Sequence, residues 1–120
     1  MAFRTDSGTV APKRAALYLR VSTGRQAAGD VSIPSQRDLT RRYCESHGWT
    51  VTEEFIEPGA SATDDRRPVF QRMLEAAASP DRRFDVICVH AFSRFYRNGA
   101  EMELTIRRLR KQGVEVVSVT

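Results

Sequence analysis

Cysteine and lysine are scarce in this sequence, and it has no long apolar run. Its two cysteines, Cys44 and Cys88, are too few for the disulfide framework of a small secreted domain, so we expect a reducing, cytoplasmic setting. No apolar run approaches the roughly 18 residues that a membrane span requires. Residues 1–14 lack the apolar centre of a signal peptide. These absences argue against a membrane protein and against a disulfide-stabilised scaffold.

The shortage of lysine gives the positive charge a particular chemistry. Lys13 and Lys111 are the only lysines among 19 basic residues, and the rest are arginines, whose planar fork binds phosphate with two nitrogens at once. The net charge is +4, and the segment 81–112 accounts for all of it. An arginine-rich solvated helix face would give this pattern, and so would a surface that binds a phosphate-bearing partner.

Length and composition indicate one globular domain of 120 residues, with 41% hydrophobic and 28% charged residues. We expect residues 1–14 to be a flexible leader. Short apolar runs and amphipathic stretches then alternate, which predicts strands followed by helices. The expected strands are 15–21, 49–56, 84–89 and 114–119, and the expected helices are 33–47, 68–79 and 99–112.

The helices are expected to bury one apolar face each. In the first helix Leu39, Tyr43, Cys44 and His47 share a face, and Gly48 ends the helix. The inward residues of the other two helices are expected to be Val69, Phe70, Met73, Leu74 and Ala77, and then Met102, Ile106 and Leu109.

The alternation of strands and helices predicts an α/β fold. It would be a three-layer, Rossmann-like domain around a mostly parallel sheet of at least four strands. Ligands of such sheets bind beyond the carboxyl ends of the strands. The residues that follow the first three strands include Arg20, Ser22 and Gln26; Glu57 and Ser61; and Ser93, Arg94 and Arg97. We therefore expect serines and arginines to meet at one edge of the sheet.

Several kinds of site do not fit these residues. The glycine-rich motifs of nucleotide sites are missing. Cys44 with His47 and Cys88 with His90 lack the spacing of a structural zinc site, so we expect no metal and no cofactor. A hydrolase would need a base such as histidine near its serine, and the G-x-S-x-G elbow is absent.

Phosphoryl transfer fits better, because positioned positive charge does most of its work. Arginines at 20, 67, 94 and 97 could supply that charge without a metal. On spacing alone a plainer interpretation is equally open. In that interpretation Ser22 is a turn residue, and Arg94 and Arg97 are a solvated helix start.

Four segments resemble the catalytic domain of serine site-specific recombinases, the resolvase/invertase family, and most closely its large serine integrases. Tyr18-Leu-Arg-Val-Ser22-Thr resembles the family's Y-x-R-V-S-T opening, with Gln26 four residues after the serine. Ser32-Ile-Pro-Ser-Gln36 and the helix ending His47-Gly-Trp49 are similar to the large integrases. Glu57-Pro-Gly-Ala-Ser61 and Arg67-Pro-x-Phe70 resemble the family's mobile loop and the arginine behind it. Phe92-Ser-Arg-Phe-Tyr-Arg-Asn98 is similar to D-R-x-x-R-N/D.

The resemblance covers residues 15–120 and implies an activity. This segment would be the resolvase-type catalytic domain, truncated at its C-terminal end. Ser22 would attack a DNA phosphodiester and form a 5′-phosphoserine link, without metal or ATP. Arg20, Arg67, Arg94 and Arg97 would hold the phosphate, while Tyr18, Gln26, Gln36, Glu57, Ser61 and Ser93 would support the site. An arginine, a carboxylate or water could accept the serine proton.

The resemblance also implies partners. They would be double-stranded DNA and further copies of the protein, as a dimer and, in synapsis, a tetramer. Two residues depart from the family pattern, because Asp is usual where Ser93 stands and commoner than Glu at position 57. Fewer or altered carboxylates could weaken the support of the arginines. The alternative is therefore a catalytically weakened regulatory or assembly domain.

Overall fold

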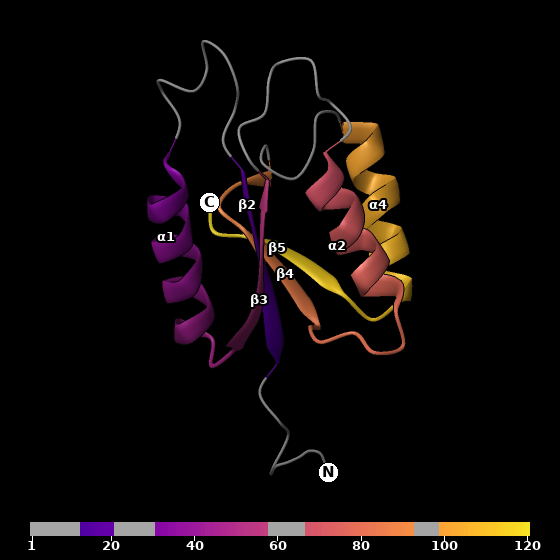
Figure 1. Ribbon diagram of the computed structural model, residues 1–120, viewed down its shortest axis with the longest axis horizontal. Helices are drawn as coiled ribbons and strands as arrows, with labels where there is room; N and C mark the ends of the chain where they lie inside the picture. The colour runs from indigo at the N-terminus through magenta and orange to yellow at the C-terminus, as the bar shows by residue number, and fades with distance from the viewer. Residues whose placement is uncertain (1–12, 21–30, 58–66, 93–98) are drawn as a thin grey trace.

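The structure is a computed structural model that describes residues 13–20, 31–57, 67–92 and 99–120. Strands and helices alternate along the described chain, as the sequence predicts (Figure 1). Their order is β2 (Arg14–Arg20), α1 (Ile33–Ser46), β3 (Thr50–Glu57), α2 (Pro68–Ala78), β4 (Val86–Val89), α4 (Gly99–Lys111) and β5 (Glu115–Ser118). The strands β4 and β5 are shorter than the expected 84–89 and 114–119.

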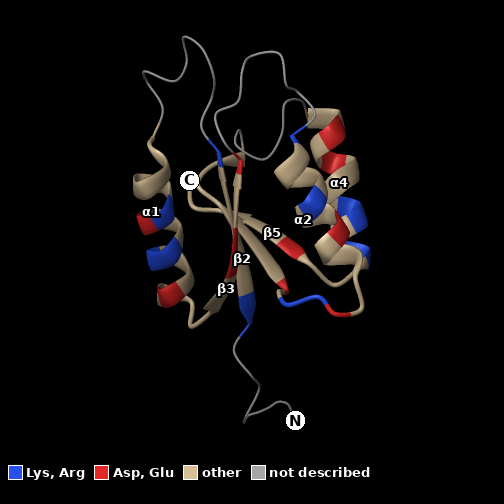
Figure 2. Cartoon of the chain, in the orientation of Figure 1, with Lys and Arg blue, Asp and Glu red and all other residues tan. Residues whose placement is uncertain are grey.

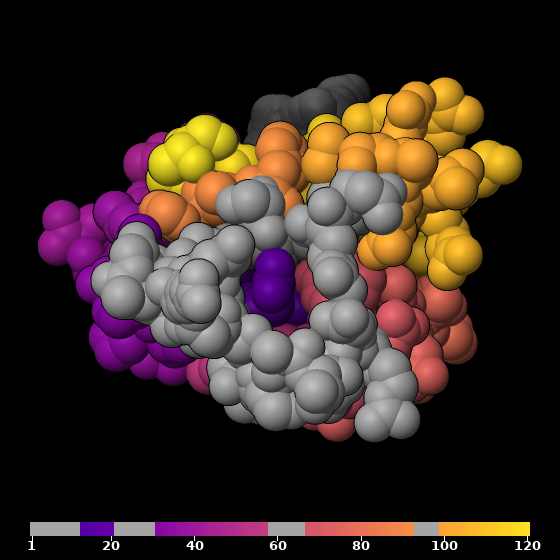
Figure 3. All heavy atoms as spheres, turned by 90° about the horizontal axis from the view of Figure 1, so that it is seen from above, coloured from indigo at the N-terminus to yellow at the C-terminus, as the bar shows by residue number. Residues whose placement is uncertain are grey.

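The four strands form one sheet in the order β3-β2-β4-β5, and every neighbouring pair is parallel. Helix α1 covers one face of the sheet, and α2 and α4 cover the other (Figure 1). This three-layer α/β arrangement confirms the predicted fold class. All strands therefore end at the same edge of the sheet, where Figure 3 looks down on the molecule, with β2 (indigo) in the middle.

Each face of the sheet has its own apolar core. The larger core joins alternate residues of β2 and β4, such as Tyr18 and Ile87, to Phe70 and Met73 of α2 and Leu109 of α4. The expected inward faces of these two helices are thus confirmed. The smaller core lies under α1 and contains Ala15, Leu17, Leu19, Cys44, Val86 and Cys88.

The predicted inward face of α1 is wrong in part. Leu39 is 39% exposed and His47 is exposed, whereas Gln36, Thr40 and Cys44 are fully buried. Polar side chains can occupy this face because each has hydrogen-bond partners among backbone groups. The Thr40 hydroxyl, for example, donates to the carbonyl of Gln36 at 2.7 Å. The hydrophobic pattern cannot register such satisfied polar groups.

The helix ends follow their sequence signals. The Ser32 hydroxyl caps α1 by accepting a hydrogen bond from the amide of Ser35 at 3.3 Å, and a proline follows in the first turn. Gly48 follows α1 with φ of 73°, and Gly113 follows α4 with φ of 89°. These left-handed conformations suit glycine, so each glycine ends its helix as expected.

Charged pairs hold the amino-terminal ends of the strands. Arg14 donates to both carboxylate oxygens of Asp85, at 3.1 and 3.0 Å, and its Nη1 also reaches the carbonyl of Arg82. These hydrogen bonds lower the pKa of Asp85 to about 2. The pair fastens β2 to the segment that leads into β4, at the edge opposite the expected site. Figure 2 shows the basic end of α4.

Candidate active site

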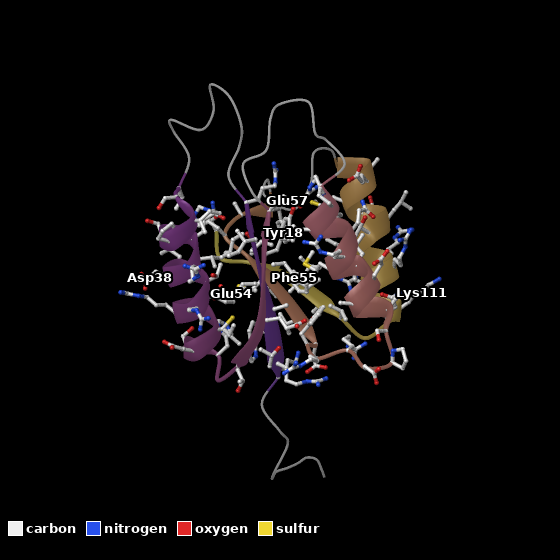
Figure 4. All side chains as sticks on the ribbon, in the orientation of Figure 1. Tyr18, Asp38, Glu54, Phe55, Glu57 and Lys111 are labelled. Atoms are coloured by element: carbon white, nitrogen blue, oxygen red, sulfur yellow. The ribbon has the colours of Figure 1, made fainter. Side chains whose placement is uncertain are left out.

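Three polar side chains meet at the carboxyl edge of the sheet, beside α2. Tyr18 comes from β2, Glu57 is the last residue of β3, and Arg67 directly precedes α2. The Tyr18 hydroxyl donates to Oε1 of Glu57 at 2.8 Å, and it accepts from Nε and Nη2 of Arg67 at 3.3 and 3.1 Å. Figure 4 shows Tyr18 and Glu57 together at this end of the sheet. Of the residues expected to meet at this edge, Glu57 lies in this cluster, together with Tyr18 and Arg67, which the family resemblance had named.

Glu57 also caps helix α2. Its Oε2 accepts a hydrogen bond from the amide of Val69 at 3.1 Å, and its Oε1 accepts one from the amide of Phe70 at 2.9 Å. The residue at the capping position, Arg67, makes no side-chain cap itself. A buried carboxylate from β3 thus satisfies two amides that a helix leaves unpaired, where the helix dipole also favours negative charge.

Arg67 is only 7% exposed, and the surroundings of its side chain are specific. Its guanidinium carbon lies 4.0 Å from the ring centre of Phe70, within the range of a cation–π contact. Its backbone is left-handed, with φ of 51°, which is unusual for a residue with a side chain. This conformation lets the backbone start α2 while the side chain lies over Phe70 and reaches Tyr18.

The Tyr18 hydroxyl stays protonated in this setting. Its burial raises its pKa above the ordinary value, and the positive charge of Arg67 opposes this only in part. A protonated hydroxyl can donate to Glu57 and accept from Arg67 at the same time. Tyr18 therefore links the carboxylate to the guanidinium.

Gln36 and Arg20 are joined through the backbone of β2. The Gln36 side chain is fully buried; its Nε2 donates to the carbonyls of Arg20 at 2.9 Å and Val31 at 2.8 Å. Its Oε1 lies 3.3 Å from the Arg20 amide, from which it accepts. Gln36 was expected at the site, and the structure places it against the last residue of β2.

The remaining predicted site residues lie outside the described part of the chain. They are Ser22, Gln26, Ser61, Ser93, Arg94 and Arg97. Their roles stay predictions. Of these, Ser22 comes two residues after Arg20, the last residue of β2.

The cysteines and histidines form no site of their own in the described ranges. Cys44 and Cys88 are buried, and the neighbouring Cys44 thiol together with burial raises the pKa of the Cys88 thiol. The His47 ring stacks on Tyr43 with 4.3 Å between ring centres. Among residues 13–20, 31–57, 67–92 and 99–120, no group of three or more histidine, cysteine or acidic side chains could hold a metal ion.

Two features of the site were missed from the sequence. Phe70 was assigned to the core alone, yet its ring also lies beneath the Arg67 guanidinium. Glu57 was assigned to the site alone, yet it also caps α2. The Arg67-Pro-x-Phe70 pattern could have indicated the first feature. Residues three positions apart at a helix start lie on the same side of the helix and can contact each other.

Comparison with known proteins identifies the class to which this fold and site belong. Residues 15–120 match the Resolvase N-terminal domain family, which covers most of the chain. The chain belongs to this family, whose members include the catalytic domains of serine recombinases, and this confirms the resemblance found in the sequence. Its general role is in site-specific recombination.

Particular relatives give the same picture. The chain is 41% identical over 63 residues to "Uncharacterized immunity region protein 3" of Bacillus phage phi105, which covers 52% of this chain and 77% of that protein. A resolvase family site-specific recombinase from Streptococcus pneumoniae matches with a TM-score of 0.78 and 28% identity, covering 89% of this chain and 72% of the other.

An integrase has a similar structure. The N-terminal catalytic domain of TP901-1 integrase matches with a TM-score of 0.74 and 28% identity, over 89% of this chain and 77% of that chain. The proteins that this chain resembles thus include an integrase, a resolvase-family recombinase and a phage protein. In the described ranges, the helices are too short or too polar to cross a bilayer.

Proposed function

We propose that this chain is the catalytic domain of a serine recombinase that cleaves and rejoins DNA through Ser22. The observation that carries the proposal is the cluster of Tyr18, Glu57 and Arg67 at the carboxyl edge of the sheet, in a chain of the resolvase family. The segment with Ser22 starts at that edge, where parallel α/β sheets bind their ligands.

The proposed step is a transfer of a phosphoryl group between two oxygens. The Ser22 Oγ loses its proton and bonds to the phosphorus of a DNA phosphodiester. The bond from phosphorus to the 3′ oxygen breaks, and that oxygen takes up a proton. The product is a 5′-phosphoserine link and a free 3′-hydroxyl. Because one phosphate ester replaces another, the reverse attack by a 3′-hydroxyl rejoins DNA without ATP.

Arginines would stabilise the transition state of this step. Arg67 is nearly buried and fixed by Tyr18 and Phe70, so its positive charge acts with little screening by water. Arg20, Arg94 and Arg97 would supply further positive charge around the phosphate. We propose that Glu57 acts through Tyr18, as a positioning residue for Arg67.

We further propose that residues 15–120 act within a longer recombinase. Its other regions would hold double-stranded DNA and join copies into a dimer and a synaptic tetramer. The expected leader 1–14 is too long by two residues, because Arg14 begins β2 and Lys13 pairs with Glu115 of β5; a leader would end before Lys13.

The test is the covalent protein–DNA adduct in the full-length recombinase, trapped on a suicide substrate. Ser22→Ala should abolish the adduct and leave DNA affinity within about twofold, because only the nucleophilic oxygen is lost. Ser46→Ala, at the end of α1, is the matched control and should form the adduct normally. An adduct in Ser22→Ala would refute the assignment. A wild-type enzyme that binds its site but forms no adduct would favour a regulatory domain.

A second measurement concerns metals. If arginines supply the positive charge, cleavage should persist in excess chelator. Loss of cleavage in EDTA that Mg²⁺ restores would instead indicate a metal-dependent nuclease.

A further inference from the structure

Gln36 lies at the end of β2 and bonds to the backbone of Arg20 on the side that faces away from β3. The carbonyl of Arg14 accepts from the amide of Asp85, so it points toward the segment leading into β4. Backbone groups of a strand alternate between its two neighbours with a period of two. The amide and carbonyl of Arg20 therefore point to the same side as those of Arg14. Strand β4 ends at Val89, which pairs with Tyr18, so the ladder between β2 and β4 stops two residues before Arg20; on its other side Arg20 pairs with Glu57 of β3.

The side-chain amide of Gln36 fills that place. It presents one acceptor to the Arg20 amide and one donor to the Arg20 carbonyl, as a peptide group of a neighbouring strand would. Its second N–H reaches the carbonyl of Val31. Arg20 and Val31 are the two described residues that flank the segment 21–30, and this segment contains Ser22.

We propose that Gln36 is a positioning residue for the nucleophile. It substitutes for a strand of the sheet at Arg20 and fixes both ends of the segment that carries Ser22. Being fully buried, with both N–H groups used on backbone carbonyls, it holds the chain and does not bind phosphate. The inference rests on the proposed function, since it assigns a purpose to the placement of Ser22.

The position of Gln36 is itself well fixed. It lies in the first turn of α1, and its backbone amide donates to the carbonyl of the capping residue Ser32 at 2.8 Å. The start of α1 thus aims the side chain at β2. Since a nucleophile misplaced by about 1 Å can lose on the order of 10²-fold in rate, this fixed geometry should matter for chemistry more than for DNA affinity.

The experiment measures single-turnover adduct formation by the full-length recombinase at saturating DNA. Gln36→Met keeps the length of the side chain and removes its polar atoms. Its rate should fall on the order of 10²-fold, with DNA affinity within about twofold. Thr40→Val is the matched control, because Thr40 is equally buried one turn later and bonds only to backbone carbonyls within α1. Its rate should stay within about threefold of wild type.

Two results would overturn the proposal. One is a wild-type rate in Gln36→Met; the other is an equal loss in both variants, which would mean that general destabilisation is the cause. Gln36→Glu keeps the acceptor and loses both donors, so its rate should fall as far as that of Gln36→Met.

Hydrogen exchange by NMR tests the geometry separately, on the wild-type 120-residue chain. The side-chain amide protons of Gln36 and the backbone amide of Arg20 should both be protected. Exchange at the rate of free amides would overturn the proposal even if Ser22 proved to be the nucleophile. If both are protected in a protein that forms no adduct, the hydrogen bonds of Gln36 to Arg20 and Val31 are confirmed, and only the proposed function is contradicted.

Discussion

The hydroxyl of Tyr18 and the carboxylate of Glu57 form a 2.8 Å hydrogen bond between the ends of two neighbouring strands. The same hydroxyl accepts two hydrogen bonds from Arg67, and the same carboxylate caps α2. A single buried contact therefore connects the sheet, the start of a helix and the arginine proposed to stabilise the transition state. Substitutions around this contact should separate these contributions.

Tyr18→Phe should slow catalysis and lower stability together. It removes only the hydroxyl, leaving Glu57 and Arg67 without their common partner, which costs about 1–3 kcal/mol for buried groups. Adduct formation should fall by about tenfold or more, with little change in DNA affinity. Tyr43→Phe, on α1, is the control for loss of a tyrosine hydroxyl. Wild-type rates in Tyr18→Phe would show that Arg67 needs no such support.

Glu57→Gln should destabilise the domain through the helix cap. One amide oxygen would have to serve three donors, the amides of Val69 and Phe70 and the Tyr18 hydroxyl. We expect the free energy of unfolding to fall by about 1–2 kcal/mol in urea titrations. Glu54→Gln, also on β3 but paired with surface arginines, should cost less than about 1 kcal/mol. Equal losses in the two variants would contradict the capping role.

Arg67→Lys tests whether position 67 needs the planar guanidinium of arginine or only a positive charge. Lysine keeps the positive charge, but it cannot place two nitrogens on Tyr18 while lying flat over Phe70. The cleavage rate of the full-length enzyme should fall by a factor on the order of 10²–10³, as for loss of one transition-state donor. A rate near wild type would mean that position 67 contributes charge alone.

The Arg14–Asp85 pair should make the free energy of unfolding depend on pH in the acidic range. Its hydrogen bonds hold the pKa of Asp85 at about 2, against an ordinary value of 3.8. A lowered pKa in the folded state stabilises the fold above pH 3.8, and this stabilisation is lost as the pH falls toward 2. Because the pair is partly exposed, water screens it, and we expect its contribution to stability to be small.

Urea titrations of Asp85→Asn measure this contribution. The variant should be less stable than wild type at pH 7, and the difference should shrink toward pH 2. A difference that does not change with pH would show that the carboxylate charge is not what stabilises the edge.

The fold was predictable because its signals are local and repeated. Alternating apolar runs and helical patterns indicated the parallel sheet, and Ser32, Gly48 and Gly113 indicated helix ends. The inward face of α1 was not predictable in the same way. Gln36 and Thr40 are buried because backbone groups from elsewhere, or from the helix itself, accept their hydrogen bonds. No hydrophobic pattern contains that information.

For the candidate site, the sequence could indicate some of the residues but not the hydrogen bonds between them. Placing Glu57 and Arg67 at one edge followed from topology and resemblance alone. The link between them through Tyr18 depends on how α2 docks against the ends of β2 and β3. That docking is a tertiary property, so the sequence could indicate which residues gather there but not which atoms bond.

At position 67, the residue that is best for the stability of the fold differs from the residue that catalysis requires, because the backbone of Arg67 is left-handed. An L-residue in this conformation costs about 1–2 kcal/mol, whereas glycine adopts it freely. We expect the contacts of the guanidinium with Tyr18 and Phe70 to offset only part of that cost. In a library randomised at position 67, selection for folded protein alone should therefore enrich glycine and asparagine. Selection for recombination should keep arginine, so the two enriched sets would differ at this residue and agree through most of the core.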